Sequence, residues 1–157
     1  MVIRKSRGFI KKSTIANEVR LAKITGSIVQ PASGALPLFK GDFKNSQYLF
    51  DNKKSFSDTI NLSKDMFKQL IKDAKQMSRT PCLSLTLMNY DFWILPIRSV
   101  NIKPTDKVEL IEINKFCKLK VEELRNRTIY LGFELDIMPS IWILLNDKQF
   151  IGEKHGQ

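Results

Sequence analysis

The chain has 157 residues, 43% of them hydrophobic, which is typical of one globular domain with a core of its own. This composition argues against disorder, and the absence of an apolar run of roughly 20 residues argues against a membrane-spanning helix. A formal net charge of +10 indicates a polyanionic partner, either nucleic acid or an anionic membrane or acidic protein.

The basic N-terminus is not followed by the apolar segment of a signal peptide. Cys82 and Cys117 lie far apart, without the spacing of metal ligands, which favours two free, buried thiols in a reducing compartment. We therefore expect a soluble protein of the cytoplasm, or of the host-cell cytoplasm if the chain is viral, with no membrane partner.

Residues 1–12 are rich in cations and contain no acid. They are interpreted as a solvated tail, as an organelle transit peptide or as a basic arm that holds a DNA backbone. In the last interpretation the phosphate-binding side chains are Arg4, Lys5, Arg7, Lys11 and Lys12.

A helix is predicted from about residue 13 to residue 24, closed by Gly26. Glu18 falls on or beside its inward stripe, and an acid that faces inward needs a partner. It is either a capping or salt-bridged glutamate or a third carboxylate at a metal site. Apolar residues at helical spacing predict the stripe itself: Ile15, Val19 and Ala22.

Residues 26–37 form a loop rich in small residues, which ends just before the Lys40-Gly41-Asp42 turn. The loop is either a plain connector or a substrate-positioning segment in which the Ser33 hydroxyl contacts a phosphate.

The stretch around Tyr48 to Lys53 predicts a strand. Side chains alternate along a strand, so Asp51 and Lys53 share one face, about 7 Å apart along the chain. Asp42 and Asp51 supply the hard oxygen ligands that Mg²⁺ prefers, and the Asn52 carbonyl lies beside them. Lys53 would offset charge at phosphorus, although acid-x-Lys pairs are also common as solvated ion pairs.

Ser63 is suited to cap a helix from Lys64 to Met77. Strands are predicted at 82–88 and 92–95, with a turn between them and Pro96 at the end. This order predicts an α/β fold with a mixed central sheet flanked by helices. Lysines line one face of the helix, either as a solvated face or as a DNA track: Lys64, Lys68, Lys72 and Lys75.

The sequence from about Val100 weakly repeats the earlier part. Residues 108–116 resemble 48–56, and the predicted strands at 129–135 and 141–145 resemble the strand pair at 83–95. We interpret 1–99 as a core, 100–152 as a β-rich C-terminal α+β extension, and 153–157 as a disordered tail. The extension is either a degenerate internal copy or two unrelated hairpins of similar composition.

These features together resemble the PD-(D/E)XK nuclease superfamily, and within it the Holliday junction resolvases of archaea and their phage-borne relatives. The likeness runs from Arg4 to about Ile97 and includes the Glu18 helix, the Ser33-Gly34 loop, Lys40-Gly41-Asp42 and Asp51-Asn52-Lys53. The resemblance implies a restriction-endonuclease-like core and places the family's site residues on Glu18, Ser33, Asp42, Asp51 and Lys53. The family more often has Glu where Asp51 stands, and small resolvases lack the extension after Val100.

The resemblance implies a Mg²⁺-dependent endonuclease, with Mn²⁺ able to substitute, that resolves four-way DNA junctions by phosphodiester hydrolysis. Asp42, Asp51, Asn52 and Glu18 would surround the metal, while Lys40 and Lys54 would join the basic arm on DNA phosphates. Symmetric cleavage of two strands implies a homodimer. The alternatives are a restriction- or repair-type nuclease on duplex DNA and a non-catalytic DNA-binding module on a nuclease fold.

Overall fold

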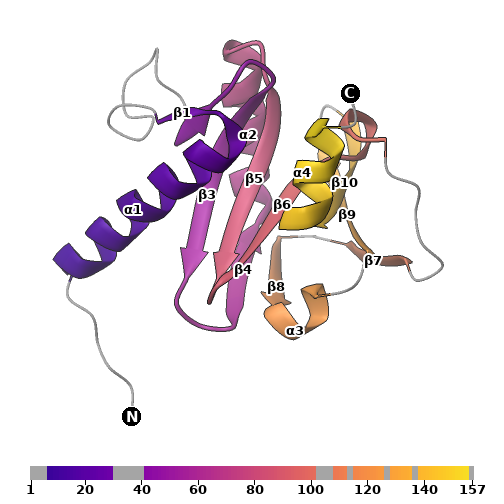
Figure 1. The fold of residues 1–157 in the computed structure, drawn as a ribbon. Coiled ribbons are helices and arrows are strands. Elements are labelled where there is room, and N and C mark those ends of the chain that lie inside the picture. The colour runs from indigo at the N-terminus through magenta and orange to yellow at the C-terminus, as the bar shows by residue number, and fades with distance from the viewer. Residues whose placement is uncertain are drawn as a thin grey trace.

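The computed structural model describes residues 7–29, 41–101, 108–112, 115–125, 128–135 and 138–155. The described strands form an eight-stranded sheet in the order β1-β2-β3-β5-β6-β10-β9-β7 and a separate ribbon of β4 and β8. Helices α1 and α4 cover one face of the sheet, and α2 lies on the other with the ribbon (Figure 1). The predicted mixed central sheet flanked by helices is confirmed.

The first part of the chain contributes two helices and six strands among the described residues. Their bounds are α1 Arg7–Thr25, β1 Ile28–Val29, β2 Phe43–Lys44, β3 Tyr48–Ser55, β4 Thr59–Ser63, α2 Lys64–Gln76, β5 Thr80–Leu87 and β6 Tyr90–Pro96. The remaining elements are a 3₁₀ turn Ile97–Ser99, β7 Val108–Glu112, β8 Phe116–Lys120, α3 Val121–Leu124, β9 Thr128–Leu135, β10 Met138–Asn146 and α4 Asp147–His155.

Helix α1 differs from its prediction in two ways. It begins at Arg7, so residues assigned to a basic arm are helical, and it ends as expected where Gly26 takes a φ of 63°. The predicted stripe was wrong at two of its three positions, because Ile15 and Val19 are 47% and 40% exposed, while Ala22 is buried as predicted. The buried side chains are Asn17, Glu18, Leu21, Ala22 and Thr25.

The cause lies in what α1 packs against. The sheet beneath it presents Ser84 and Thr86 as well as apolar residues, and Asn17 Nδ2 donates to Thr86 Oγ1 at 3.0 Å. A partly polar surface selects a partly polar helix face, since buried polar groups need hydrogen-bond partners. Glu18 is turned toward the sheet by this packing.

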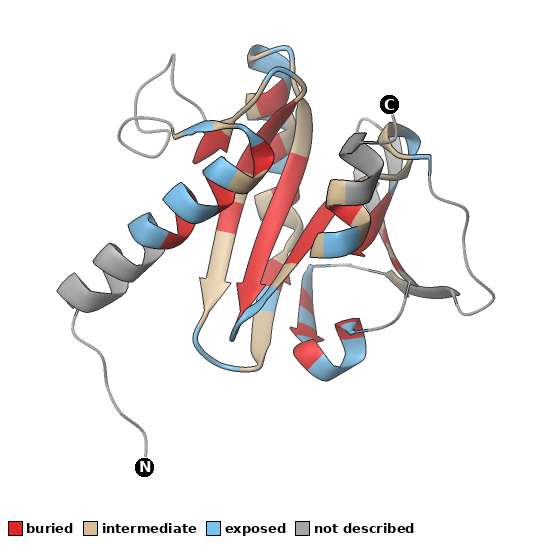
Figure 2. Ribbon diagram, viewed as in Figure 1, coloured by how far each residue is buried: buried red, intermediate tan, exposed pale blue. Residues whose placement is uncertain are grey.

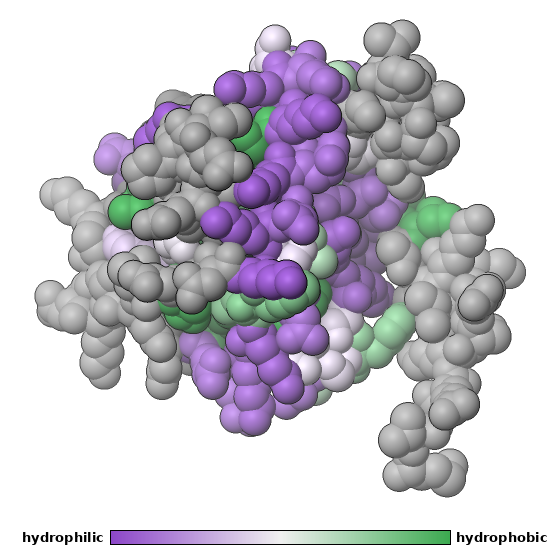
Figure 3. Space-filling model, turned by 180° about the vertical axis from the view of Figure 1, so that it is seen from behind, coloured by the Kyte–Doolittle hydropathy of each residue, from purple (hydrophilic) through white to green (hydrophobic). Residues whose placement is uncertain are grey.

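Helix α2 follows its prediction closely. Ser63 Oγ accepts a hydrogen bond from the Met66 amide at 3.3 Å, which caps the helix, and Phe67, Leu70 and Ala74 are buried. The helix connects β3 to its parallel neighbour β5 across the back face of the sheet. Seen from behind, this side of the molecule presents mostly hydrophilic side chains (Figure 3), and Lys68, Lys72 and Lys75 are exposed there.

Two apolar clusters hold the central strands on both faces. One joins Leu49, Leu83 and Phe67 on the α2 side, and the other joins Phe50 and Trp93 beneath α1 and α4. Strand β5 is buried along most of its length (Figure 2). Strand β3 is therefore fixed from both sides, which gives its side chains defined positions.

The strand pairings of β3–β6 recur in β7–β10. Parallel pairs β3–β5 and β7–β9 each lead to a hairpin, β5–β6 or β9–β10, and the two hairpins meet where β6 pairs with β10. The boundary placed at residue 100 therefore falls within one continuous sheet. The β5–β6 turn consists of Met88 and Asn89, one residue earlier than predicted.

Residues 153–155 belong to α4, although a disordered tail was predicted from residue 153. Phe150 explains this helix, since its ring stacks on Trp93 with centroids 4.6 Å apart. Cys82 and Cys117 are free and buried, as expected. Among the described residues, no helix is long and apolar enough to cross a membrane.

Candidate active site

The turn before β2 places Asp42 against β3. Gly41 has a φ of 75°, and a Cβ there would lie 2.8 Å from Leu49 Cδ1 and 3.0 Å from the Phe50 carbonyl oxygen. Only glycine fits this approach. It lets the Asp42 amide donate to the Phe50 carbonyl at 2.9 Å, while Asp42 Oδ2 accepts from the Asn52 amide at 2.7 Å.

Strand β3 brings a second acid and a lysine to the same place. Lys53 Nζ lies 3.5 Å from Asp51 Oδ2, as the strand period requires for residues two apart. Their side chains are 35% and 25% exposed, so both can contact a ligand from solvent. The Asp51 carboxyl also hydrogen-bonds that of Asp42.

Helix α1 supplies the third acid. Glu18 is only 5% exposed, and burial together with the negative charge of Asp51 raises the pKa of its carboxyl. The Glu18 charge in turn raises the pKa of Asp42. The three acids therefore lie within electrostatic range of one another.

Asp42 is the most strongly affected of them. Burial, followed by the charge and hydrogen bond of Asp51, raises its pKa to about 8, against the opposing effect of the Asn52 amide. Near neutral pH this carboxyl keeps a proton because burial, and then the negative charge of Asp51, disfavour its ionised form. A cation bound between the two carboxylates would remove that cost.

The Asn52 backbone faces the same cluster. Within a strand residue the N–H and C=O point to the same side, so the Asn52 carbonyl lies along the edge where its amide meets Asp42. Its side chain points to the α1 face, where Oδ1 accepts from Ser84 Oγ at 3.0 Å. Its Nδ2 is buried without a hydrogen-bond partner.

These donors fit a hard divalent cation. Mg²⁺ is usually held by one or two protein carboxylates and fills its other positions with water and substrate phosphate, and Asp42, Asp51 and the Asn52 carbonyl supply oxygen ligands. Within the described ranges, no group of three or more His, Cys, Asp or Glu side chains is arranged to hold a metal ion. The fit therefore depends on two carboxylates rather than three.

The other predicted site residues are distributed differently. Ser33, Lys40, Arg4 and Lys5 lie outside the described residues. Arg7, Lys11 and Lys12 lie on the first turns of α1, for which only the backbone is described. Lys54 is on the opposite face of β3 from Lys53, with its Nζ 5.2 Å from the centroid of the Phe56 ring.

Sequence reasoning missed the residues that hold α1 in place. Arg20 Nη1 and Nη2 donate to the two carboxylate oxygens of Asp91 at 2.7 and 2.8 Å, and Nη2 also donates to Asn17 Oδ1 at 2.7 Å. Thr86 Oγ1 donates to Asp91 Oδ1 at 2.8 Å and completes the network. The available signal was the polar Ser84 and Thr86 inside an otherwise apolar strand.

No protein-family model matches this sequence, and neither does any curated protein. What can be said of the site therefore comes from its geometry and electrostatics.

Proposed function

We propose that the chain is a Mg²⁺-dependent endonuclease with a restriction-endonuclease-like core of the PD-(D/E)XK superfamily, cutting branched DNA such as four-way junctions. Mn²⁺ should substitute for Mg²⁺, because it accepts the same oxygen ligands. The chemistry that such an ion supplies is Lewis-acid polarisation of the phosphate and a lower pKa for water.

Each residue of the cluster has a role in this proposal. Asp42 and Asp51, with the Asn52 carbonyl, hold the cation. Lys53 Nζ hydrogen-bonds the attacking water and offsets the negative charge that develops on the phosphate oxygens. Glu18 orients water at the cluster from the α1 side.

The observation that carries the proposal is the placement of Asp42 against β3, where its carboxyl accepts from the Asn52 amide at 2.7 Å beside Asp51 and Lys53, whose charged groups are 3.5 Å apart. The raised pKa of Asp42 supports it. Buried acids that repel one another cost stability, so their presence in one place suggests a ligand that compensates for the cost. The adjacent Lys53 and the net charge of +10 suggest that the ligand is a metal together with a polyanion.

The same proposal includes a homodimer in the cytoplasm, since symmetric cleavage of two strands needs two sites and the described residues contain one such cluster. The basic residues on and beside the α1 start would then contact DNA phosphates, together with Lys40 and Lys54.

The test compares a synthetic four-way junction with linear duplex of the same sequence, with Mg²⁺ or with chelator. We expect Mg²⁺-dependent cleavage that Asp51→Asn and Lys53→Ala slow by at least ~100-fold, the scale for removing one transition-state contact. Asp73→Asn and Lys118→Ala are matched controls on α2 and β8 and should stay within about twofold.

The outcomes separate the rival functions. Equal rates on junction and duplex would replace the resolvase by a restriction- or repair-type nuclease. Binding of DNA with no Mg²⁺-dependent cleavage of either substrate would contradict nuclease activity and favour the non-catalytic DNA-binding module.

A further inference from the structure

Exposed apolar side chains gather at one end of the sheet. Among the described residues, eight large hydrophobic side chains are exposed, and three of them are Phe56 at 43%, Met88 at 51% and Tyr90 at 38%. The strand register brings the ends of β3, β5 and β6 together, because Ser55 pairs with Leu87 and Leu87 pairs with Tyr90. Tyr90 lies on the Leu87 face of the sheet and Lys54 on the opposite face, so the exposed side chains surround this end from both faces. The Met88 amide also donates to the Ser55 carbonyl at 3.4 Å.

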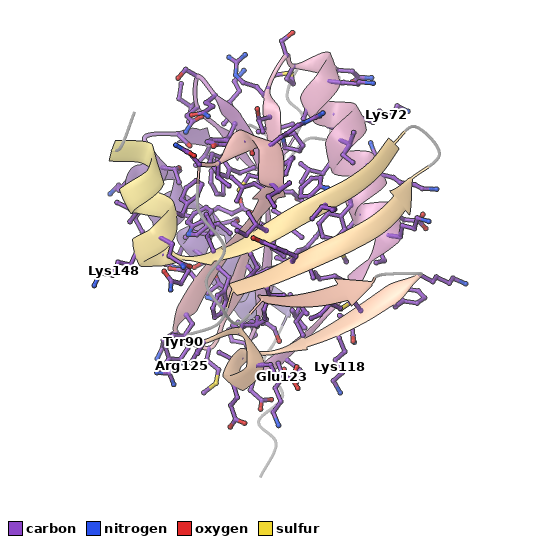
Figure 4. The ribbon with its side chains drawn as sticks, turned by 90° about the vertical axis from the view of Figure 1, so that its right-hand side faces the viewer. Lys72, Tyr90, Lys118, Glu123, Arg125 and Lys148 are labelled. Atoms are coloured by element: carbon purple, nitrogen blue, oxygen red, sulfur yellow. The ribbon has the colours of Figure 1, made fainter. Side chains whose placement is uncertain are left out.

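The aromatic rings of Phe56 and Tyr90 each have a cationic side chain over them. Lys54 Nζ is 5.2 Å from the centroid of the Phe56 ring, and Arg125 Cζ is 4.5 Å from that of Tyr90. Figure 4 shows Tyr90 and Arg125 side by side at this end of the molecule. We call Lys54, Phe56, Met88, Tyr90 and Arg125 the sheet-end surface.

A backbone hydrogen bond and a cation–ring contact hold the parts of the sheet-end surface together. The Val121 amide of α3 donates to the Asp58 carbonyl at 2.8 Å, which ties α3 to the loop that contains Phe56. Arg125, just after α3, reaches Tyr90 on the neighbouring hairpin. Lys54, Arg125 and the adjacent Lys53 bring positive charge to this end, and the exposed α3 glutamates Glu122 and Glu123 offset part of it.

Met88 gives an independent indication that this surface is not merely a solvated turn. Its φ is 55°, in the left-handed region, at the first position of a two-residue hairpin turn where Gly, Asn or Asp is preferred. An exposed methionine is unfavourable there for both its backbone and its side chain. Strained positions of this kind tend to occur where a side chain is needed for function.

The sheet-end surface adjoins the proposed cleavage centre. Phe56 follows Lys53 by three residues, about 10 Å of extended chain. A nucleic acid whose phosphate lies at Lys53 would meet Tyr90 on the same face of the sheet and would reach Phe56 by passing around the end of β3. Bases in a duplex are stacked inside the helix, so exposed aromatic rings combined with cations suit unpaired nucleotides instead.

We propose that the sheet-end surface binds unpaired nucleotides beside the cleaved phosphate, with bases stacked on Phe56 and Tyr90, Met88 as an apolar contact, and Lys54 and Arg125 on phosphates. This inference rests on the proposed nuclease function and refines it. The preferred substrate is DNA with a single-stranded segment at the branch, rather than continuous duplex.

The test measures binding of a fluorescent twelve-nucleotide oligothymidine, and of blunt duplex of equal length, at fixed salt and without metal. Phe56→Ala and Tyr90→Ala should each weaken oligothymidine binding at least about fivefold, the lower end for losing one base–aromatic stack, and duplex binding less than twofold. Phe116→Ala is the matched control, since this ring is 66% exposed, has Lys115 Nζ 5.7 Å from its centroid, and lies at the far end of the β4–β8 ribbon.

Met88→Gly separates binding from folding. Glycine is favoured at a φ of 55°, so the melting temperature should not fall, while oligothymidine binding should weaken. Unchanged oligothymidine binding in Phe56→Ala and Tyr90→Ala, or equal losses in Phe116→Ala or with duplex, would overturn the inference.

This assay is independent of cleavage. If the wild type cuts no DNA but the binding losses appear as expected, the nuclease proposal fails and the sheet-end surface stands as a single-stranded DNA site. If the wild type cuts DNA while the variants bind oligothymidine normally, the nuclease stands and the inference about its substrate fails.

Discussion

The two halves of the sheet share one strand pattern but differ in their chemistry. Leu83 and Leu131 each lie four residues before the end of the first strand of a hairpin, and their parallel partners are Asp51 and Ile111. Asp51 lies beside Asp42 and Lys53 and within electrostatic range of Glu18, whereas Ile111 packs against the apolar cluster. Equivalent positions therefore carry a charged centre in one half and core in the other.

The flanking elements explain the difference. Strand β3 has β2 and the Asp42 turn along one edge, whereas β7 is the last of the described strands in the sheet order. Helix α1 brings Glu18 to the β3 side. The arrangement of strands is thus a scaffold, and the candidate site arises where α1, the β2 turn and β3 meet.

The largest expected effect comes from replacing Asp51 of β3 by isoleucine, the residue at the equivalent position of β7. Asp51→Ile should reduce Mg²⁺-dependent DNA cleavage by at least ~100-fold, because it removes a ligand of the proposed cation. The melting temperature should not fall, because the change removes the negative charge that raises the pKa of Asp42, which offsets the lost hydrogen bond between the two carboxyls. Single-turnover cleavage and thermal unfolding measure the two effects, and near-normal cleavage by a folded Asp51→Ile protein would show that β3 does not carry the chemistry.

The reciprocal change should damage the fold instead. Ile111→Asp puts a carboxylate without a partner against the apolar cluster, which should cost about 2–4 kcal/mol of unfolding free energy. Urea unfolding of Ile111→Asp, and of the milder Ile111→Val, measures this loss of unfolding free energy. A loss below about 0.5 kcal/mol in Ile111→Asp would mean that this position is not part of the core in solution.

The pKa of Asp42 predicts a pH dependence of stability. Its folded value of about 8 lies above its ordinary 3.8, so between these pH values the folded protein holds a proton that the unfolded chain has released. Stability should therefore fall as pH rises from about 4 to about 8. Asp42→Asn avoids this loss and should be more stable than wild type at pH 8 by more than ~1 kcal/mol.

Urea unfolding of both proteins at pH 5 and pH 8 measures this difference, and an equal gap at the two pH values would contradict it. Mg²⁺ adds a second readout that does not require activity. At ten times its dissociation constant it should stabilise the wild type by about 1.4 kcal/mol, and Asp42→Asn by clearly less.

Local features explain which elements could be predicted from the sequence. The Asp51 and Lys53 pair follows from the strand period, and α2 from its Ser63 cap and apolar stripe. The buried face of α1 could not be read in the same way, because Ile15 and Val19 satisfy helical spacing and yet the sheet beneath selects Asn17 and Glu18. Tertiary packing overrode the local pattern there.

Long-range pairing accounts for most of what was missed. The bond from Asn17 to Thr86 and the ion pair of Arg20 with Asp91 join residues 69 and 71 positions apart, and no spacing rule reports such contacts. The β4–β8 ribbon is similar, since its register links residues 59–63 to 116–120. Asp42 lies ten residues from the Asn52 amide that it accepts from, and the resemblance to a nuclease was the strongest signal that it would lie beside Asp51.

The smallest expected effect on cleavage concerns the link between α1 and the sheet, which is a feature of the first half. Arg20→Ala leaves the Asp91 carboxylate, whose side chain is 8% exposed, without its bidentate partner, and should cost about 1–2 kcal/mol. Because α1 carries Glu18, cleavage should also slow by about tenfold, as expected for a residue that orients a site residue. Lys23→Ala, an exposed cation on the same helix, is the matched control.

Arg20→Lys distinguishes positioning from charge, since lysine keeps the cation but cannot make the two parallel bonds to Asp91 and should recover only part of the rate. Full activity in Arg20→Ala would mean that the position of α1 does not depend on this network.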